Sequence, residues 1–125
     1  ATQEQTQKKA VLNKQVSVYY KTGSATLDEN AKYILDLEVA NLASTFGNAY
    51  IRISGNTDNV GNRNSNIQLS RQRAEAVKNY LNSKYKFENN KFIVKGNGPD
   101  KPVANNNSEE GRSQNRRTDF EVVPR

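Results

Sequence analysis

The sequence contains no cysteine and no histidine among its 125 residues. Without cysteine the chain has neither disulfide bonds nor thiolate ligands for a metal ion. Without histidine it lacks the usual general base at neutral pH, the Ser-His-Asp arrangement and most kinds of zinc site. Catalysis would have to rest on Asp, Glu, Lys or Tyr, so the composition disfavours an enzyme.

Long apolar runs are also absent. A hydrophobic content of 34% and a mean hydropathy of -0.95 predict a modest core surrounded by polar loops. No run approaches the roughly 18 apolar residues of a membrane-spanning helix, and the first residues contain no signal-peptide core. We expect residues 1–14 to be a linker or a trimmed end, and residues 15–125 to form one domain.

The net charge is +6 and the isoelectric point is near 9.6, which favours an anionic partner such as nucleic acid, anionic lipid or an acidic polymer. The charges do not cluster, because basic residues are spread between Arg71 and Lys101 and the following stretch mixes both signs. A small nucleic-acid-binding domain is therefore an alternative with weak support. Tyr19, Tyr20 and Tyr50 on strands are its candidate stacking surfaces.

Hydrophobic periodicity predicts the order strand, helix, strand, helix, strand, strand. The strands are expected at residues 15–20, 49–54, 91–96 and 117–123, and the helices at 28–45, where Asp28 caps the start, and at 66–81. This order predicts an α+β two-layer sandwich, with both helices on one face of a small mixed four-stranded sheet. The polar stretch 97–116 is long for a loop, so it is expected to be functional or to contain a short helix.

The helix predicted at residues 66–81 has an inward polar patch. At about 100° per residue, one half of its surface is apolar and the opposite half is wholly polar. Asn66, Ser70 and Arg73 nevertheless lie on the apolar side, together with the residues Ile67, Leu69, Ala74, Ala76, Val77, Tyr80 and Leu81. An inward arginine needs an anion, because an unpaired buried charge costs several kcal/mol or more. That anion is either a carboxylate of the same chain or a ligand.

Two motifs suggest a dinucleotide site and a calcium site, but each lacks a required residue. Gly96 and Gly98 begin a G-x-G pattern, but Lys101 stands where a dinucleotide fingerprint has its third glycine. The stretch from Asp58 hints at a calcium loop, but its twelfth position is Leu69 where a glutamate is required. We therefore expect no metal and no cofactor.

Four motifs occur in a fixed order: Thr-Asp at 57–58, N-x-x-L-S-x-x-R-A at 66–74, G-x-G-x-x-x-P at 96–102, and N-R-R at 115–117. Together they resemble the OmpA C-terminal-like family of peptidoglycan-binding domains, which includes the peptidoglycan-associated lipoproteins and the flagellar stator proteins. The resemblance covers residues 16–123. It implies non-covalent, non-enzymatic anchoring to a Gram-negative-type cell wall in the periplasm, associated with the outer membrane.

In that family, the aspartate and arginine at the positions of Asp58 and Arg73 hold the diaminopimelate residue of the wall's stem peptide. The resemblance implies that Arg73 offers a planar fork to a ligand carboxylate, while Asp58 receives an ammonium group and loop NH groups receive a carboxylate. Both interpretations of Arg73 then hold in turn: an internal pair with Asp58 when the site is empty, and a ligand clamp when it is filled.

The resemblance also implies supporting residues. Asn56 and Thr57 precede Asp58. Asn66 and Leu69 share a helix face, where Asn66 either hydrogen-bonds the ligand or ties down the loop. Thr22 and Gly23 either line the pocket or form an ordinary strand exit. Residues 115–117 (Asn115, Arg116 and Arg117) are expected to be chiefly structural, by pairing with carboxylates and holding the last strand, with direct contact to the wall as the minor alternative.

One position departs from the family. Many relatives carry an acidic residue where this chain has Lys21, so a second anchor for the ligand's ammonium group is missing or reversed here. An enzyme that uses Asp58 as a general base is a third function class, but it lacks a second convergent catalytic group. The wall-binding interpretation accounts for the inward Arg73, whereas the nucleic-acid interpretation leaves it unexplained.

Overall fold

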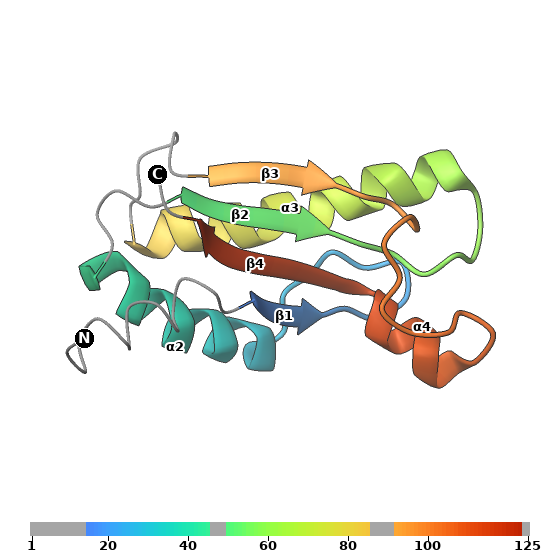
Figure 1. Cartoon of the computed structure of the whole chain (residues 1–125), viewed down its shortest axis with the longest axis horizontal. Coiled ribbons are helices and arrows are strands. Elements are labelled where there is room, and N and C mark those ends of the chain that lie inside the picture. The colour runs from blue at the N-terminus through green and yellow to red at the C-terminus, as the bar shows by residue number, and fades with distance from the viewer. Residues whose placement is uncertain (1–14, 46–49, 86–91, 124–125) are drawn as a thin grey trace, which may run out of the picture.

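The computed structural model describes residues 15–45, 50–85 and 92–123, drawn in colour in Figure 1. Along the chain the elements are β1 (Gln15–Tyr19), α2 (Glu29–Thr45), β2 (Tyr50–Gly55), α3 (Arg63–Tyr85), β3 (Phe92–Gly96), α4 (Glu109–Asn115) and β4 (Arg117–Val123). The strands form one sheet in the order β1-β4-β2-β3, in which only the β2–β3 pair is parallel. The predicted α+β fold with a mixed sheet is confirmed. The predicted linker at residues 1–14 lies outside the described residues.

Capping residues explain where the helices begin. The Asp28 side chain accepts a hydrogen bond from the Ala31 amide at 2.8 Å, as predicted. Helix α3 begins three residues before the predicted start, because Asn62 Oδ1 accepts the Asn64 amide at 2.8 Å. The long polar stretch contains α4, whose N-cap Ser108 accepts the Gly111 amide at 3.1 Å.

One face of the sheet forms the core. Alternate side chains of β1, β2 and β4 pack against α2 and α3 in a single apolar cluster, and α3 runs along β2 and β3 while α2 lies beside β1 (Figure 1). The buried apolar residues are Val18, Tyr20, Ala31, Leu35, Ile51, Ile53, Ala74, Val77, Leu81 and Phe120. Ile67 is an exception to the predicted helix face: it is 36% exposed, at the N-terminal end of α3 beside Gly98. No helix in the described ranges is long and apolar enough to cross a membrane.

A close approach between β2 and α3 positions the chain that follows β2. A Cβ atom placed on Gly55 would lie 1.7 Å from the Ser70 carbonyl oxygen, so only glycine fits at this crossing. The strand therefore ends directly against the inward polar patch of α3. The next three residues, Asn56 to Asp58, therefore follow beside this patch, and all three are buried.

Candidate functional site

The carboxyl ends of β1 and β2 and the start of β4 meet at one end of the sheet, because β4 runs antiparallel to both neighbours. Backbone hydrogen bonds connect the segments there: the Asn56 amide donates to the Arg117 carbonyl at 2.8 Å, and the Thr57 amide to the Gly98 carbonyl at 3.0 Å. The loops and α4 gather at this end in Figure 1. The predicted site residues are thus brought together by strand order.

Arg73 lies at the centre of this end and is completely buried. Its guanidinium donates to three backbone carbonyls: Nε to Ser24 at 2.8 Å, Nη2 to Lys21 at 3.1 Å and Nη1 to Asn56 at 2.9 Å. The Tyr20 ring lies 5.0 Å from the guanidinium carbon. Burial lowers the pKa of Arg73 to about 10, so the side chain keeps its charge at neutral pH. The inward polar patch is confirmed, since Asn66 and Ser70 are buried beside it.

Asp58 pairs with a different arginine from the one predicted. Its Oδ2 lies 3.2 Å from Nη1 of Arg116, and both side chains are 9% exposed. Its Oδ1 accepts the Val60 amide at 3.1 Å. The interpretation of an internal Arg73–Asp58 pair is therefore wrong, because three neutral carbonyls take the guanidinium of Arg73 while Arg116 takes the carboxylate.

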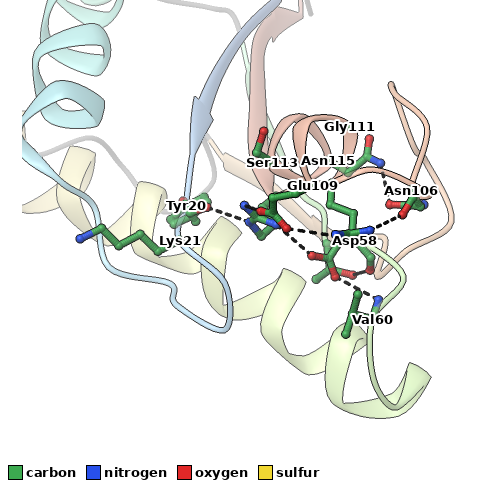
Figure 2. Close-up of polar contacts among 12 residues, drawn as sticks. Tyr20, Lys21, Asp58, Val60, Asn106, Glu109, Gly111, Ser113 and Asn115 are labelled. Carbon is green, nitrogen blue, oxygen red and sulfur yellow. Dashed lines mark hydrogen bonds and ion pairs between the residues drawn. The ribbon is translucent and has the colours of Figure 1, made fainter.

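Arg116 connects the site to α4. Its Nη2 lies 2.7 Å from Glu109 Oε1, and its Nε donates to the Tyr20 carbonyl at 3.3 Å. Burial acts to lower the pKa of Arg116, but hydrogen bonds to Glu109 and Asp58 raise it above its usual range. Figure 2 shows Tyr20, Asp58 and Glu109 gathered in this network, while the Lys21 side chain points away from Asp58.

The turn after β1 lies directly over Arg73. Thr22 and Gly23 are exposed at its tip, where Gly23 has φ of 69° and the Ser24 amide donates to the Lys21 carbonyl at 3.1 Å. The two carbonyls of this turn that accept hydrogen bonds from Arg73 belong to Lys21 and Ser24, at the two ends of the turn. A shallow cavity of about 350 Å³ opens beside it, lined by Lys21, Arg116 and the residues Tyr19, Tyr20, Asp28, Ser113 and Gln114.

The supporting residues mostly hold the loop that contains Asp58. Asn66 Nδ2 donates to the Val60 carbonyl at 3.0 Å, so the contact observed is the one that ties down the loop. Thr57 Oγ1 donates to the Asp58 carbonyl at 2.7 Å, and the Asn56 side chain donates to the Ser54 carbonyl at 3.0 Å. Leu69 is half-buried on α3.

Asn115 and Arg117 hold the loop before α4. Asn115 is fully buried and makes four hydrogen bonds of 2.8 to 3.0 Å to residues 103–106. Arg117 Nε lies 3.1 Å from Asp119 Oδ1, and its Nη2 donates to the Lys101 carbonyl at 2.9 Å. Both side chains therefore hold the framework around the site.

Sequence reasoning missed two members of the network. Tyr20 could be placed on the inner face of β1 from its alternation, but its hydrogen bond to the Arg73 carbonyl, at 3.0 Å, depends on the packing of α3. Glu109 lies in a mixed-charge stretch with no distinguishing pattern. Within the described residues, no group of three acidic side chains is placed to hold a metal ion.

The sequence profile of the OmpA family matches residues 19–116. The chain belongs to the OmpA family. The matched span includes every candidate site residue from Thr22 to Arg116, so the network described above lies within the family domain.

Among curated relatives of this OmpA family domain, outer membrane protein Omp38 of Acinetobacter baumannii is 36% identical over 85% of the chain. Outer membrane protein A of Bordetella avium is 36% identical over 92%. The chain spans only 30% and 57% of the lengths of these two proteins. The crystal structure of the peptidoglycan-associated lipoprotein from Burkholderia pseudomallei is 32% identical, with a TM-score of 0.78 over 85% of this chain and 88% of that one.

Proposed function

We propose that this domain binds peptidoglycan without catalysis, recognises the diaminopimelate residue of a stem peptide, and thereby anchors its parent protein or the outer membrane to the cell wall. The observation that carries the proposal is the buried Arg73, whose hydrogen-bond acceptors in the described part of the chain are all neutral carbonyls. The similarity to a peptidoglycan-associated lipoprotein supports the same ligand class.

A ligand carboxylate would compensate the charge of Arg73. Two of its nitrogens, Nε and Nη2, donate to carbonyls at the two ends of the turn 21–24. A carboxylate that replaced these carbonyls would form charge-assisted hydrogen bonds, which are roughly twice as strong as those to neutral acceptors. We therefore propose that the turn, with Thr22 and Gly23 at its tip, moves aside when ligand binds.

The ammonium group of the same ligand would bind beside Asp58. This carboxylate lies next to Arg73 but is held by Arg116, so the site presents opposite charges side by side, matching a zwitterion. Lys21 points away from Asp58 and carries a positive charge at the cavity, which is unfavourable for an ammonium group on that side (Figure 2). We propose that Asp58 alone receives the ammonium, with Asn56, Thr57, Asn66 and Leu69 supporting its loop.

Localisation and domain limits belong to the same proposal. The relatives are named as outer membrane proteins and a peptidoglycan-associated lipoprotein, which supports a periplasmic place beside the wall. We assign residues 15–125 to the wall-binding domain. Attachment of the parent protein to a membrane is proposed to occur through sequence outside this domain.

Calorimetric titration with a stem peptide that contains meso-diaminopimelate tests the proposal. The parent domain should bind, and Asp58→Asn and Arg73→Lys should each lower the affinity at least tenfold. Arg73→Lys keeps the charge but cannot reach three carbonyls or a carboxylate with one planar fork. The matched control is Arg71→Lys on the outer face of α3, where Arg71 pairs with Glu75.

Three different outcomes would each contradict a different part of this proposal. A folded parent that does not bind the peptide would refute the diaminopimelate assignment. Equal binding of a peptide with L-lysine at the third position would refute recognition of the second carboxylate. Binding of any oligonucleotide with a steep dependence on salt would favour the nucleic-acid alternative instead.

A further inference from the structure

A groove of about 610 Å³ lies on the outer face of the sheet, opposite the face covered by α2 and α3. Its lining contains four basic and two acidic side chains, from β2, β3, β4 and the loop after β3. They are Arg52, Lys95, Lys101, Arg117, Asp119 and Glu121. The groove is therefore polar and carries an excess of positive charge.

Both acidic side chains of the groove are already paired with arginines. Glu121 Oε1 lies 2.9 Å from Arg52 Nη1 on the neighbouring strand β2. Asp119 Oδ1 lies 3.1 Å from Arg117 Nε, and both of these side chains are largely shielded from solvent. The arginine charges are thus balanced within the sheet, and the excess positive charge belongs to the two lysines.

Lys95 is held away from the carboxylate of Asp119, and Lys101 lies beside a carboxylate that already has an arginine partner. In the sheet register Lys95 lies opposite Ser54, and Ser54 lies opposite Asp119, so two strand spacings of about 5 Å each separate Lys95 from that carboxylate. Lys101 is positioned by its carbonyl, which accepts Arg117 Nη2 at 2.9 Å. Its neighbour Asp100 is engaged by both terminal nitrogens of Arg63.

Neither lysine forms an ion pair within the described ranges. Both are exposed, and Val103 beside Lys101 is 58% exposed. The groove therefore offers two exposed ammonium groups without an ion-pair partner in those ranges, and apolar contacts with Pro102 and Val103, along an open channel. This arrangement complements a chain that carries carboxylates at intervals and small apolar groups between them.

We propose that this groove is a second contact with the wall polymer, in which Lys95 and Lys101 bind carboxylates of a stem peptide adjacent to the one held at Asp58 and Arg73. The proposal rests on the proposed function and extends it from one stem peptide to the polymer. Stem peptides combine free carboxylates with alanine methyl groups, which match the lysines and Val103.

The groove contributes through multivalency. Two exposed lysines bind a single carboxylate weakly, because solvent screens the attraction. Once one stem peptide is bound in the pocket, a neighbouring one is present at high effective concentration, so a weak second contact raises the affinity for the polymer severalfold or more. The groove should therefore affect binding to intact wall and not to a soluble stem peptide.

The test compares Lys95→Gln/Lys101→Gln with a control that loses the same charge elsewhere, Lys32→Gln/Arg71→Gln. Lys32 and Arg71 are partly exposed on α2 and α3, and among the described residues each pairs with a carboxylate of its own helix. Each protein is titrated with the soluble diaminopimelate stem peptide and is co-sedimented with purified sacculi at low and at physiological salt. Thermal unfolding checks that both variants fold.

We expect both variants to bind the stem peptide within twofold of the parent. On sacculi at low salt, the groove variant should lose at least about fivefold in affinity, whereas the control should change by less than twofold, and the difference should shrink as salt rises. Equal losses in the two variants, or no loss in either, would overturn the groove contact.

Other results separate the groove from the pocket. If the parent binds sacculi but not the stem peptide, the proposed pocket fails, and a selective loss in the groove variant still supports the groove. If the groove variant loses binding to phosphatidylglycerol vesicles while its sacculus binding is unchanged, the groove serves a lipid surface and the proposal is refuted.

Discussion

Replacing Tyr20 by phenylalanine removes one buried hydroxyl beneath the candidate site and keeps the ring that lies against Arg73. The hydroxyl donates to the Arg73 carbonyl at 3.0 Å and lies 2.9 Å from Thr118 Oγ1. Thr118 is fully buried, so its hydroxyl would lose a partner that water cannot readily replace. At neutral pH the variant should lose about 1–3 kcal/mol of unfolding free energy.

The same substitution should change the pH dependence of stability. Burial raises the pKa of Tyr20 from 10.0 to about 12, against the opposing effects of Thr118 and Arg73. The folded state thus favours the protonated phenol. This contribution, about 2.7 kcal/mol for two pKa units, is complete below about pH 10 and is lost as the pH rises from there through about 12.

Urea unfolding of parent and Tyr20→Phe, followed by circular dichroism between about pH 8 and about pH 12, measures both effects. The stability difference should be constant up to about pH 10 and should then fall towards zero or reverse, because only the parent has a phenol to ionise at this position. A difference that stays constant to the highest pH would refute the raised pKa.

Tyr19→Phe is the matched control, since this neighbouring tyrosine is 50% exposed on the outer face of the sheet. Its stability difference from the parent should be small at every pH. A fall like that expected for Tyr20→Phe would show that the effect does not depend on burial.

Two further predictions concern the framework of the site, and urea unfolding measures both. Gly55→Ala should lower the unfolding free energy by about 3 kcal/mol or more, because its Cβ would lie 1.7 Å from the Ser70 carbonyl oxygen. Gly61→Ala is the control: its Cβ would meet open space, and its φ of 91° should cost only about 1–2 kcal/mol. Equal losses in the two variants would contradict the close approach at Gly55. Asn115→Ala should cost about 2–4 kcal/mol through its four lost hydrogen bonds. Asn115→Asp should cost more than Asn115→Ala, because a carboxylate oxygen would replace the donating Nδ2 and would face the Ala104 carbonyl and Asn106 Oδ1 as a third acceptor in a buried site; a smaller loss than for alanine would contradict that donor role.

Local periodicity was sufficient to predict the strands, the two long helices and one unusual feature of the site. The inward positions of Asn66, Ser70 and Arg73 follow from the helical repeat alone, because residues at these spacings share one face whatever surrounds the helix. The same repeat misplaced Ile67, which lies on the apolar side of the helix but is 36% exposed. The helix α4 was expected only as one of two options, since seven residues carry little periodicity.

The partners of the site residues could not be predicted in the same way. Arg73 was expected to pair with Asp58, 15 positions away, but it donates to carbonyls 49 and 52 positions away in the turn after β1. Asp58 pairs instead with Arg116, 58 positions distant. Several arginines and carboxylates occur in the sequence, and nothing in their spacing tells which pairs the chain brings together.

The sequence by itself therefore determined the order of the four strands and the two long helices, the membership of the family, and the presence of a charged side chain on a buried helix face. These depend on the alternation of side chains along single elements and on motifs within them. Only the tertiary structure decided which groups satisfy Arg73 and Asp58, and which lysines along the groove form no ion pair with the described residues. Those outcomes depend on strand order and register, which bring distant segments within hydrogen-bonding distance and hold others apart.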